Sequence, residues 1–579
     1  MLKLYSRYLK SYTGQMILIV LFTLGFTGST MVLPTLSKSV IDKGAIAGDT
    51  GAIVKYALIM LLVAILCITA GVLGNYFTSG VVMGATRDMR NRLFERVIRF
   101  SQEDEDKIGT ASLISRQSKD ILTSQNTMLQ MFQMMLQAPL MCIAGIVLAV
   151  STSPSLSWII AVLLPLAAVT MAVAIKLTQP IFRASQKKVD RVNGVMRETL
   201  TGMRVIRAFN REDYETERFA GVSDDLKNNI KKGFKIMNLL LPIIIFLANG
   251  SNLLILGFGA DYMKRGLATY GDVQAFVQYT TMILMAFMLG SMFLMLMPNA
   301  QASAERINEV WSIEPSIVNK ENAEKLPEVG NAFIEVDHIS YRFPGASQNV
   351  LTDISFSAKA GQTVAIIGGT GSGKSTLLNV LCRNFDVTEG SVKIDGVDVR
   401  DAEISDLKAH ISLVPQKAFL FAGSIIDNIR YGKPDASEEE VKHALDISQS
   451  SEFVSKKEYG MYTYIAQAGT NVSGGQKQRL AIARALVRKA DIYMFDDSFS
   501  ALDFKTDAKL RGELSGELKN AVTIIVAQRV STIKNADRIL VLEEGKVVGD
   551  GTHDELLASN RVYREIAMSQ LSESEVKGA

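Results

Sequence analysis

Six long apolar runs before residue 300 limit most strongly what this 579-residue chain can fold into. Crossing the hydrocarbon of a bilayer takes about 20 apolar residues in a helix, and each run meets that length. The runs lie near residues 15–37, 54–82, 128–151, 156–177, 236–262 and 273–298. We therefore predict six membrane-spanning helices.

Positive charges predict the orientation of these helices. The connections after the second and fourth runs are long and rich in Arg and Lys, whereas "STSPS" between the third and fourth runs has neither. Basic loops stay on the cytoplasmic side. Helical periodicity continues through both basic connections, so we expect helices that extend well beyond the bilayer, by about 30 Å for every 20 residues.

The N-terminal stretch "MLKLYSRYLKSYTGQ" alternates basic, tyrosine and leucine positions, which predicts an amphipathic helix on the inner membrane surface. No small-residue cleavage site follows the first apolar run, so we expect a retained span in the cell membrane. The net charge of +3 indicates no nucleic-acid partner. Cys67, Cys142 and Cys382 lie too far apart for a metal site and are expected to be packing residues.

Composition changes after about residue 305, where charged residues return at ordinary density. We expect a transmembrane domain over residues 1–305, a linker over 306–330 and a cytoplasmic domain over 331–579. Methionines gather in the third and sixth runs, which suits either an adaptable apolar cavity or ordinary helix packing.

The segment "VAIIGGTGSGKST" is a β-branched strand that breaks into glycines and then opens a helix. It matches the phosphate-binding loop G-x-x-x-x-G-K-[ST], in which backbone N–H groups and a helix N-terminus hold phosphate. Lys374 supplies a point charge for the β and γ phosphates of ATP, and the Ser375 hydroxyl is a ligand for Mg²⁺. Residues 331–579 are therefore expected to form a nucleotide-binding domain, and the predicted fold class is an α-helical six-span membrane domain followed by an α/β P-loop domain. The candidate ATP-binding residues of this loop are Gly368, Gly369, Thr370, Gly371, Ser372, Gly373, Lys374, Ser375 and Thr376.

A second glycine loop, "SGGQ", precedes another predicted helix. It would form a second helix N-terminus that can bind phosphate. A single nucleotide does not need two such phosphate-binding loops from the same chain. The candidate residues are Ser473, Gly474, Gly475 and Gln476.

With these motifs in order, the chain resembles the ATP-binding cassette transporters, specifically half-size exporters in which one membrane domain precedes one nucleotide-binding domain. The resemblance covers essentially the whole chain. It also rests on "LVPQKAFLFAGSIIDNI" with Gln416, on the strand that ends at Asp496, on "SALD" ending at Asp503, and on "ETLTGMRVIRAFNRED" in the membrane half.

The resemblance implies a head-to-tail pair of nucleotide-binding domains, with each ATP between the phosphate loop of one and the SGGQ loop of the other. Phe343 falls where an aromatic ring stacks on adenine, and Asp503 where the two domains communicate. Asp496 and Gln416 join Ser375 at Mg²⁺. Docking helices of the membrane domain are expected near residues 105–120 and 205–220.

Two positions depart from the family pattern in ways that bear on hydrolysis. Asp497 stands where the family has the glutamate base, and Gln528 where it has a histidine that contacts the γ-phosphate. Aspartate is one methylene shorter, and glutamine cannot carry a proton or positive charge. The segment "AQAGTN" at 466–471 also departs from the family pattern and suggests altered communication with the partner, and the signature that follows it is intact apart from Val472 for the usual leucine.

The expected function is therefore ATP-driven export of amphipathic or hydrophobic compounds, of multidrug type, by a heterodimer with a second, different half-transporter. This chain would hold a hydrolysis-impaired ATP site and lend a sound SGGQ loop to its partner. A lipid, peptide or haem exporter half is the alternative within transport. An ATP-gated channel or regulatory subunit is the alternative from another class.

Overall fold

The computed structural model describes residues 1–327 and 332–570, without the side chains of Leu2, Lys3, Leu294 and Met295. The end of the expected linker, residues 328–330, and the start and tail of the expected soluble domain, residue 331 and residues 571–579, lie outside the described residues. The chain divides into two compact units. One comprises Met1–Ile98 with Thr110–Ile313, and the other Arg99–Gly109 with Glu314–Ala579.

The first unit is helical throughout, and its six longest helical stretches are long and apolar enough to cross a membrane, as predicted. Three π-helical turns, Ile41–Ala45, Arg116–Asp120 and Met131–Met135, interrupt or extend these stretches. The helices are α1 (Leu2–Leu9), α2 (Thr13–Val40), α3 (Thr50–Ile98), α5 (Thr110–Ser115), α6 (Ile121–Gln130), α7 (Gln137–Thr152), α8 (Ser157–Thr201), α9 (Met203–Ala208), α10 (Glu212–Lys264) and α11 (Tyr270–Ser312).

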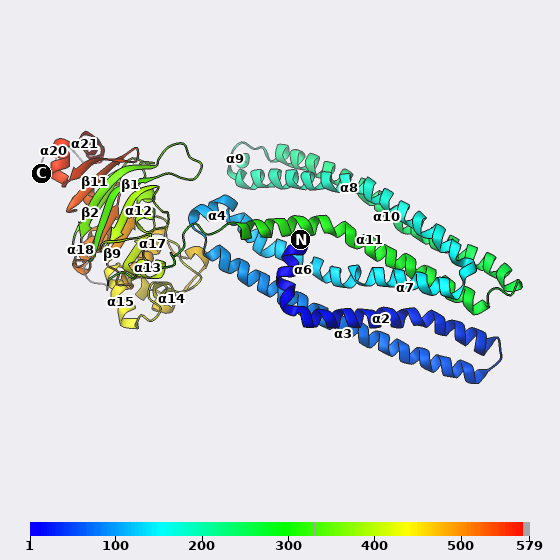
Figure 1. Ribbon diagram of the computed structural model, residues 1–579. Helices are drawn as coiled ribbons and strands as arrows, with labels where there is room; N and C mark the ends of the chain where they lie inside the picture. The colour runs from blue at the N-terminus through cyan, green and yellow to red at the C-terminus, as the bar shows by residue number, and fades with distance from the viewer. Residues whose placement is uncertain (328–331, 571–579) are drawn as a thin grey trace. The chain divides into compact units, whose positions relative to one another are not determined.

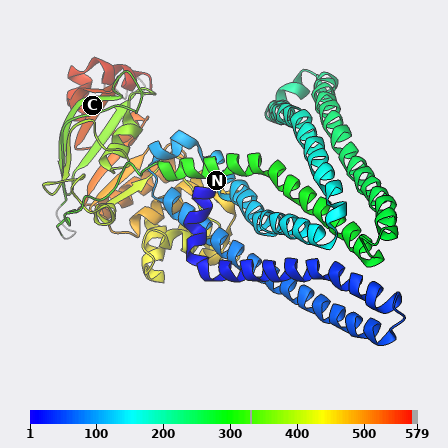
Figure 2. The ribbon, with the colours of Figure 1, turned by 45° about the vertical axis from the view of Figure 1, so that its right-hand side comes forward.

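Helices of this unit pack in pairs (Figure 1): α2 lies beside α3, α7 beside α11, and α8 beside α10. Gly145 lets α7 and α11 approach closely, because a Cβ there would lie 2.8 Å from Ile283. Figure 2 shows the α8–α10 pair leaving the other helices toward α9. Its inner-facing residues Ile159, Ile160 and Ile255 join the core that Phe276 of α11 completes.

The amphipathic N-terminal helix expected from the sequence is α1. Its alternating pattern buries Leu4, Tyr5, Tyr8 and Leu9, each at 5% exposure or less, whereas Lys10 beyond its end is exposed. Packing of this apolar face against α3 holds the N-terminus to the membrane helices.

The second unit is built on two main sheets. A four-stranded sheet has the order β2-β1-β4-β5, and a six-stranded sheet has the order β12-β11-β3-β10-β9-β6. The strands are β1 (Phe333–Tyr341), β2 (Leu351–Lys359), β3 (Thr363–Gly368), β4 (Glu389–Ile394), β5 (Val397–Asp398), β6 (Ile411–Val414), β7 (Gly423–Ser424), β8 (Tyr464–Ile465), β9 (Ile492–Asp496), β10 (Val522–Val526), β11 (Arg538–Glu543) and β12 (Lys546–Gly551).

Parallel pairing of β6, β9, β10, β3 and β11 explains their continuous apolar sequences, since helices and the second sheet cover both faces. One core lies on each face of this sheet. The helices of this unit are α4 (Gln102–Ile108), α12 (Lys374–Leu381), α13 (Ile404–His410), α14 (Ile425–Arg430), α15 (Glu438–Ile447), α16 (Ser451–Ser455), α17 (Gly474–Leu486), α18 (Phe504–Glu517), α19 (Val530–Ile533), α20 (His553–Ser559) and α21 (Arg561–Met568). Six membrane helices followed by an α/β domain confirm the predicted fold class.

Three short helices lie in the basic connections, where docking helices are expected near residues 105–120 and 205–220: α5 lies within the first range, whereas α4 and α9 each begin shortly before their range. Helix α4 starts at Gln102 because Ser101 and Asp104 form a reciprocal capping box at its N-terminus. Helix α9, Met203–Ala208, starts directly after Gly202, where α8 ends. Although α4 lies between α3 and α5 in the chain, it belongs to the second compact unit.

Candidate functional site

Four parallel neighbouring strands, β6, β9, β10 and β3, bring the candidate residues to one edge of the six-stranded sheet. Ligands of open α/β sheets bind outside the carboxyl ends of the strands. Gln416 follows β6, Asp496 ends β9 and Asp497 directly follows it, Gln528 follows β10, and the phosphate loop, residues 368–376, lies at the end of β3. The topology therefore collects side chains that lie up to 160 positions apart in the sequence (from 368 to 528).

Different glycines of the phosphate loop are required for different structural reasons. Gly371 and Gly373 adopt φ values of +83° and +97°, in the left-handed region that favours glycine. A Cβ at Gly368 would lie 2.1 Å from the carbonyl oxygen of Leu542, whereas Gly369 and Gly371 face open space. The loop thus exposes its backbone at Gly369 and Gly371 next to the start of α12, whose first N–H groups have no intrahelical acceptor.

Lys374, the first residue of α12, folds its ammonium group back onto the phosphate loop. Its Nζ donates to the carbonyl oxygens of Gly369 at 2.7 Å and Gly368 at 2.9 Å. Burial lowers the pKa of Lys374, while the nearby Asp497 and Asp496 carboxylates oppose that shift. A phosphate bound at this loop would provide a compensating negative charge for this cation.

Ser375 and Asp496 meet at the mouth of the loop. The Ser375 hydroxyl donates to Asp496 Oδ1 at 3.1 Å. Burial raises the pKa of Asp496, and the neighbouring Asp497 raises it further, whereas the bond from Ser375 lowers it. In the described part of the chain no cluster of three His, Cys, Asp or Glu side chains could hold a metal ion by itself. These oxygens fit Mg²⁺, which takes one or two protein ligands together with phosphate oxygens and waters.

Two amide side chains engage the Asp497 carboxylate. Gln528 Nε2 donates to Asp497 Oδ2 at 2.8 Å, and Gln416 Nε2 donates to the same oxygen at 3.2 Å. Asp497 is only 8% exposed and has φ +46°, a strained value for a residue other than glycine. Its backbone N–H donates to the carbonyl of Val526, which fixes the turn after β9. Asp497 and Gln528, which the sequence singles out separately, are therefore hydrogen-bonded to each other.

Gln570 positions Gln528 and was not a candidate from the sequence. Its Nε2 donates to the Gln528 carbonyl at 2.7 Å, and its Oε1 accepts from the Val530 N–H at 2.9 Å. Gln570 follows the C-terminal helix α21 and lies 42 positions from Gln528. No local motif marks such a contact, so only the fold could reveal it.

The candidate adenine-stacking residue Phe343 lies in an aromatic cluster. Its ring packs edge-on against Tyr341 at 5.1 Å and Phe385 at 5.6 Å between centroids. Tyr341 stacks on Phe385 with an interplanar angle of 15°. Phe343 is 37% exposed, so it is accessible to a ligand from solvent.

The SGGQ loop forms the exposed N-terminus of α17. Ser473 caps this helix by accepting from the Gln476 N–H at 3.3 Å, and Gln476 Oε1 accepts from the Ser473 N–H at 3.1 Å. Asp503 caps α18 in the same way, with Thr506 as the donor at 2.9 Å. Between the described residues no hydrogen bond is recorded from these caps to the phosphate loop. The structure therefore brings together the candidate residues around the phosphate loop and leaves the SGGQ loop at the surface.

The remaining candidates lie in the phosphate loop and in α12, and the segment at 466–471 precedes the SGGQ loop. Thr370 is exposed at the tip of the phosphate loop, Ser372 is buried within it, and Thr376 is half-buried in the first turn of α12. In the segment at 466–471, Ala468 has φ +56° and its carbonyl accepts from Lys477 Nζ at 3.0 Å.

Comparisons with known proteins show which proteins the whole chain is similar to. The family model for the ABC transporter transmembrane region matches residues 16–287, and the ABC transporter model matches residues 351–500. An uncharacterized ABC transporter ATP-binding protein of Mycobacterium bovis is 38% identical over 582 residues, covering 100% of both chains. The ATP-dependent lipid A-core flippase of Pseudomonas aeruginosa is 30% identical, over 99% of this chain and 97% of the flippase. The solved structure of a bacterial Atm1-family ABC exporter with ATP bound shares the fold, with a TM-score of 0.82, 24% identity, and coverage of 97% of this chain and 99% of that one.

Proposed function

Because the chain belongs to the ABC transporters, as an exporter half with one membrane domain and one ATP-binding domain, we propose that it pairs with a different half-transporter. In that heterodimer it binds ATP at a site that hydrolyses slowly and lends its SGGQ loop to the partner's site. The chain is a multi-pass membrane protein with its nucleotide-binding domain in the cytoplasm.

The geometry of the phosphate loop supports ATP binding. Lys374 and the first N–H groups of α12 would hold the β and γ phosphates, and Phe343 would stack on the base. Ser375, Asp496 and Gln416 would hold Mg²⁺. The metal supplies charge neutralisation between the phosphates.

The observation that carries the slow-site proposal is the pair of amide hydrogen bonds on Asp497. In hydrolysis of a γ-phosphate the protein contributes chiefly by positioning and charge. The Asp497 carboxylate is one methylene short of a glutamate, and misplacement by about 1 Å can cost on the order of 100-fold in rate. Gln528 and Gln416 both donate hydrogen bonds to Asp497 Oδ2, and these bonds must break before Oδ2 can accept a proton from water. Gln528 itself supplies no positive charge for the γ-phosphate.

The exposed, intact N-terminus of α17 supports the role of this chain toward a partner. Ser473 and Gln476 keep the helix start ordered, and Gly474 has open space where a side chain would lie. Such an N-terminus attracts phosphate through its N–H groups and the helix dipole. One chain therefore offers one weakened catalytic site and one sound SGGQ loop, which favours two different subunits.

Two cavities in the membrane unit support an amphipathic cargo. One of about 400 Å³ between α8 and α10 is lined by apolar side chains such as Trp158, Leu163 and Phe246. The other, of about 80 Å³, lies between α2, α3 and the Met131–Met135 turn and carries amide side chains. Lipid export is the second candidate, favoured by 30% identity to a protein named as a lipid A-core flippase.

Co-purification tests the pairing. The tagged chain, extracted from its own cells in nanodiscs, should bring a second half-transporter with it. The complex should retain ATP on this chain and accumulate a dye or fluorescent lipid in vesicles, whereas Lys374→Ala should abolish that retention. Full transport-coupled ATP hydrolysis by dimers of this chain alone would refute the heterodimer.

A further inference from the structure

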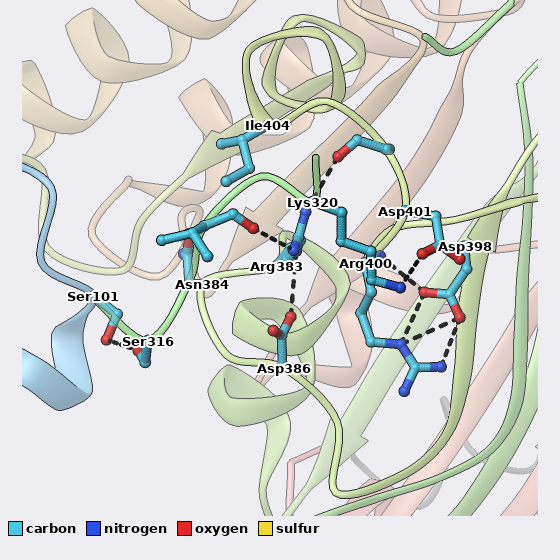
Figure 3. A network of polar contacts seen from close by, with 12 residues as sticks. Ser101, Ser316, Lys320, Arg383, Asn384, Asp386, Asp398, Arg400, Asp401 and Ile404 are labelled. Atoms are coloured by element: carbon cyan, nitrogen blue, oxygen red, sulfur yellow. Dashed lines mark hydrogen bonds and ion pairs between the residues drawn. The ribbon is translucent and has the colours of Figure 1, made fainter. Parts of the chain in front are cut away.

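The chain that joins the two units in sequence, residues 314–327, is not a loose connection, and we call it the strap. It runs along the second unit and is bonded at several points. The Ile404 N–H donates to Asn319 Oδ1 at 2.8 Å, and the Leu326 N–H donates to Asp406 Oδ2 at 2.6 Å. Lys320 forms an ion pair with Asp401 (Figure 3). A segment fixed in this way can transmit a displacement along its length.

The phosphate-loop helix is bonded to the strap through Arg383. Helix α12 begins at Lys374 in the phosphate loop and ends two residues before Arg383. The guanidinium of Arg383 donates to the Val318 carbonyl of the strap and to the Ala402 carbonyl, each at 3.2 Å, and pairs with Asp386 at 3.3 Å. Arg383 is 4% exposed and has φ +51°. Leaving a buried guanidinium unpaired is costly, so these partners fix its position.

Helix α4 is bonded to the same strap two residues earlier. The Asp104 carboxylate, fully buried, accepts from the Ser316 N–H at 2.9 Å and from the Ser316 hydroxyl at 3.1 Å. The Ser101 and Ser316 hydroxyls lie 2.7 Å apart, and Figure 3 shows them facing each other. A further hydrogen bond, from the Tyr341 hydroxyl to the Glu103 carboxylate, joins α4 to β1.

From these contacts we infer that the strap couples the phosphate-loop helix to α4 within one chain, through Arg383, Val318, Ser316 and Asp104. Arg383 is then a positioning residue, and it touches neither nucleotide nor cargo. Any shift of α12 when phosphate fills its N-terminus moves the strap and with it α4, which continues in sequence into α3 and α5. A connection that served only as a covalent link would need none of these buried polar bonds. The inference rests on the proposed binding of ATP.

Hydrogen exchange of the complete transporter in nanodiscs, with and without MgATP, tests the coupling. In the wild type, MgATP should slow exchange of the α12 amides and also of the α4 amides, each by about threefold or more, because local opening is suppressed where structure tightens. Arg383→Met should keep the α12 response and lose the α4 response. Asp104→Asn should do the same from the other end of the strap.

Lys320→Met provides a matched control, since it removes an exposed ion pair of the same strap and leaves Arg383 and Asp104 intact. It should keep both responses. If MgATP slows exchange of the α4 amides in Arg383→Met as much as in the wild type, the coupling is wrong. It is also wrong if MgATP slows exchange of the α12 amides in the wild type but leaves the α4 amides unchanged. Absence of any α12 response in the wild type would instead refute ATP binding, and the proposed function with it.

Discussion

Gln528 donates its side-chain amide to Asp497 over 2.8 Å, and so joins the two residues on which the proposed slow hydrolysis depends. The two substitutions are therefore one structural unit, with Gln416 as a second donor to the same oxygen. A glutamate at 497 would carry its carboxylate one methylene farther from the backbone, away from the position in which Oδ2 now accepts both amides. A histidine at 528 could donate there and also carry charge.

Restoring both residues should restore hydrolysis. We expect Asp497→Glu with Gln528→His to raise ATP turnover at this site by about 10²- to 10⁴-fold, the range for gain of a general base. Each single change should give less, because the residues act as a pair. Single-turnover hydrolysis, with the partner's own phosphate-loop lysine removed, measures this site alone. Turnover that stays at the wild-type rate would place the cause outside this pair.

The Mg²⁺ dependence of ATP binding should depend on Ser375. Its hydroxyl lies 3.1 Å from Asp496 Oδ1, and both oxygens would face the metal. Ser375→Ala should weaken MgATP binding by about 10-fold, the lower end of measured losses at metal sites, and leave binding of ATP in EDTA unchanged. Thr370→Ala, at the exposed loop tip, serves as the control. Equal losses with and without Mg²⁺ would show that Ser375 does not serve the metal.

The edge of the six-stranded sheet could be predicted from sequence, because β3, β9 and β10 are uninterrupted apolar strands followed at once by polar motifs. Their carboxyl ends had to meet once the strands were parallel. The hydrogen bond from Gln528 to Asp497 could not be predicted, since it depends on side-chain geometry after two different strands. Gln570 and the Arg383–Val318 bond were equally hidden, because long-range polar contacts leave no periodic pattern in the sequence.

Asp104 should make stability depend on acid pH. Its pKa is lowered from 3.8 to about 2: burial would raise it, but the bonds from Ser316, Lys107 and Ser101 outweigh that effect. A carboxyl with a lowered folded-state pKa stabilises the fold above its unfolded value, and this stabilisation is lost as pH falls from about 4 toward 2. The gap in thermal unfolding midpoint between wild type and Asp104→Asn should be constant from about pH 7 to 5 and shrink below about pH 4. Glu321→Gln, on the exposed part of the strap, should show no gap. A gap for Asp104→Asn that widens toward acid pH would contradict the assignment.

Amide side chains in the smaller membrane cavity should affect cargo recognition. Gln133, in the π-helical turn, donates to Asn75 Oδ1 of α3 at 3.2 Å, beside Phe22 and Phe132. Amide groups in a hydrocarbon environment are costly unless hydrogen bonded, and this cavity has room for a polar group of a cargo molecule. The pair has no charge and suits an uncharged polar group next to an apolar body.

Replacing both amides, Asn75→Leu with Gln133→Leu, should raise the concentration of cargo needed for half-maximal ATPase stimulation by about 10-fold, as expected for the loss of one or two hydrogen bonds to a ligand. Basal ATPase should stay as it is, because the ATP site lies in the other unit. A fluorescent phosphatidylethanolamine and a cationic dye, titrated separately, distinguish lipid from multidrug cargo. Asn252→Leu, which removes an amide of α10 outside this cavity, is the matched control. An unchanged titration with both probes in the double variant would exclude the cavity from cargo binding.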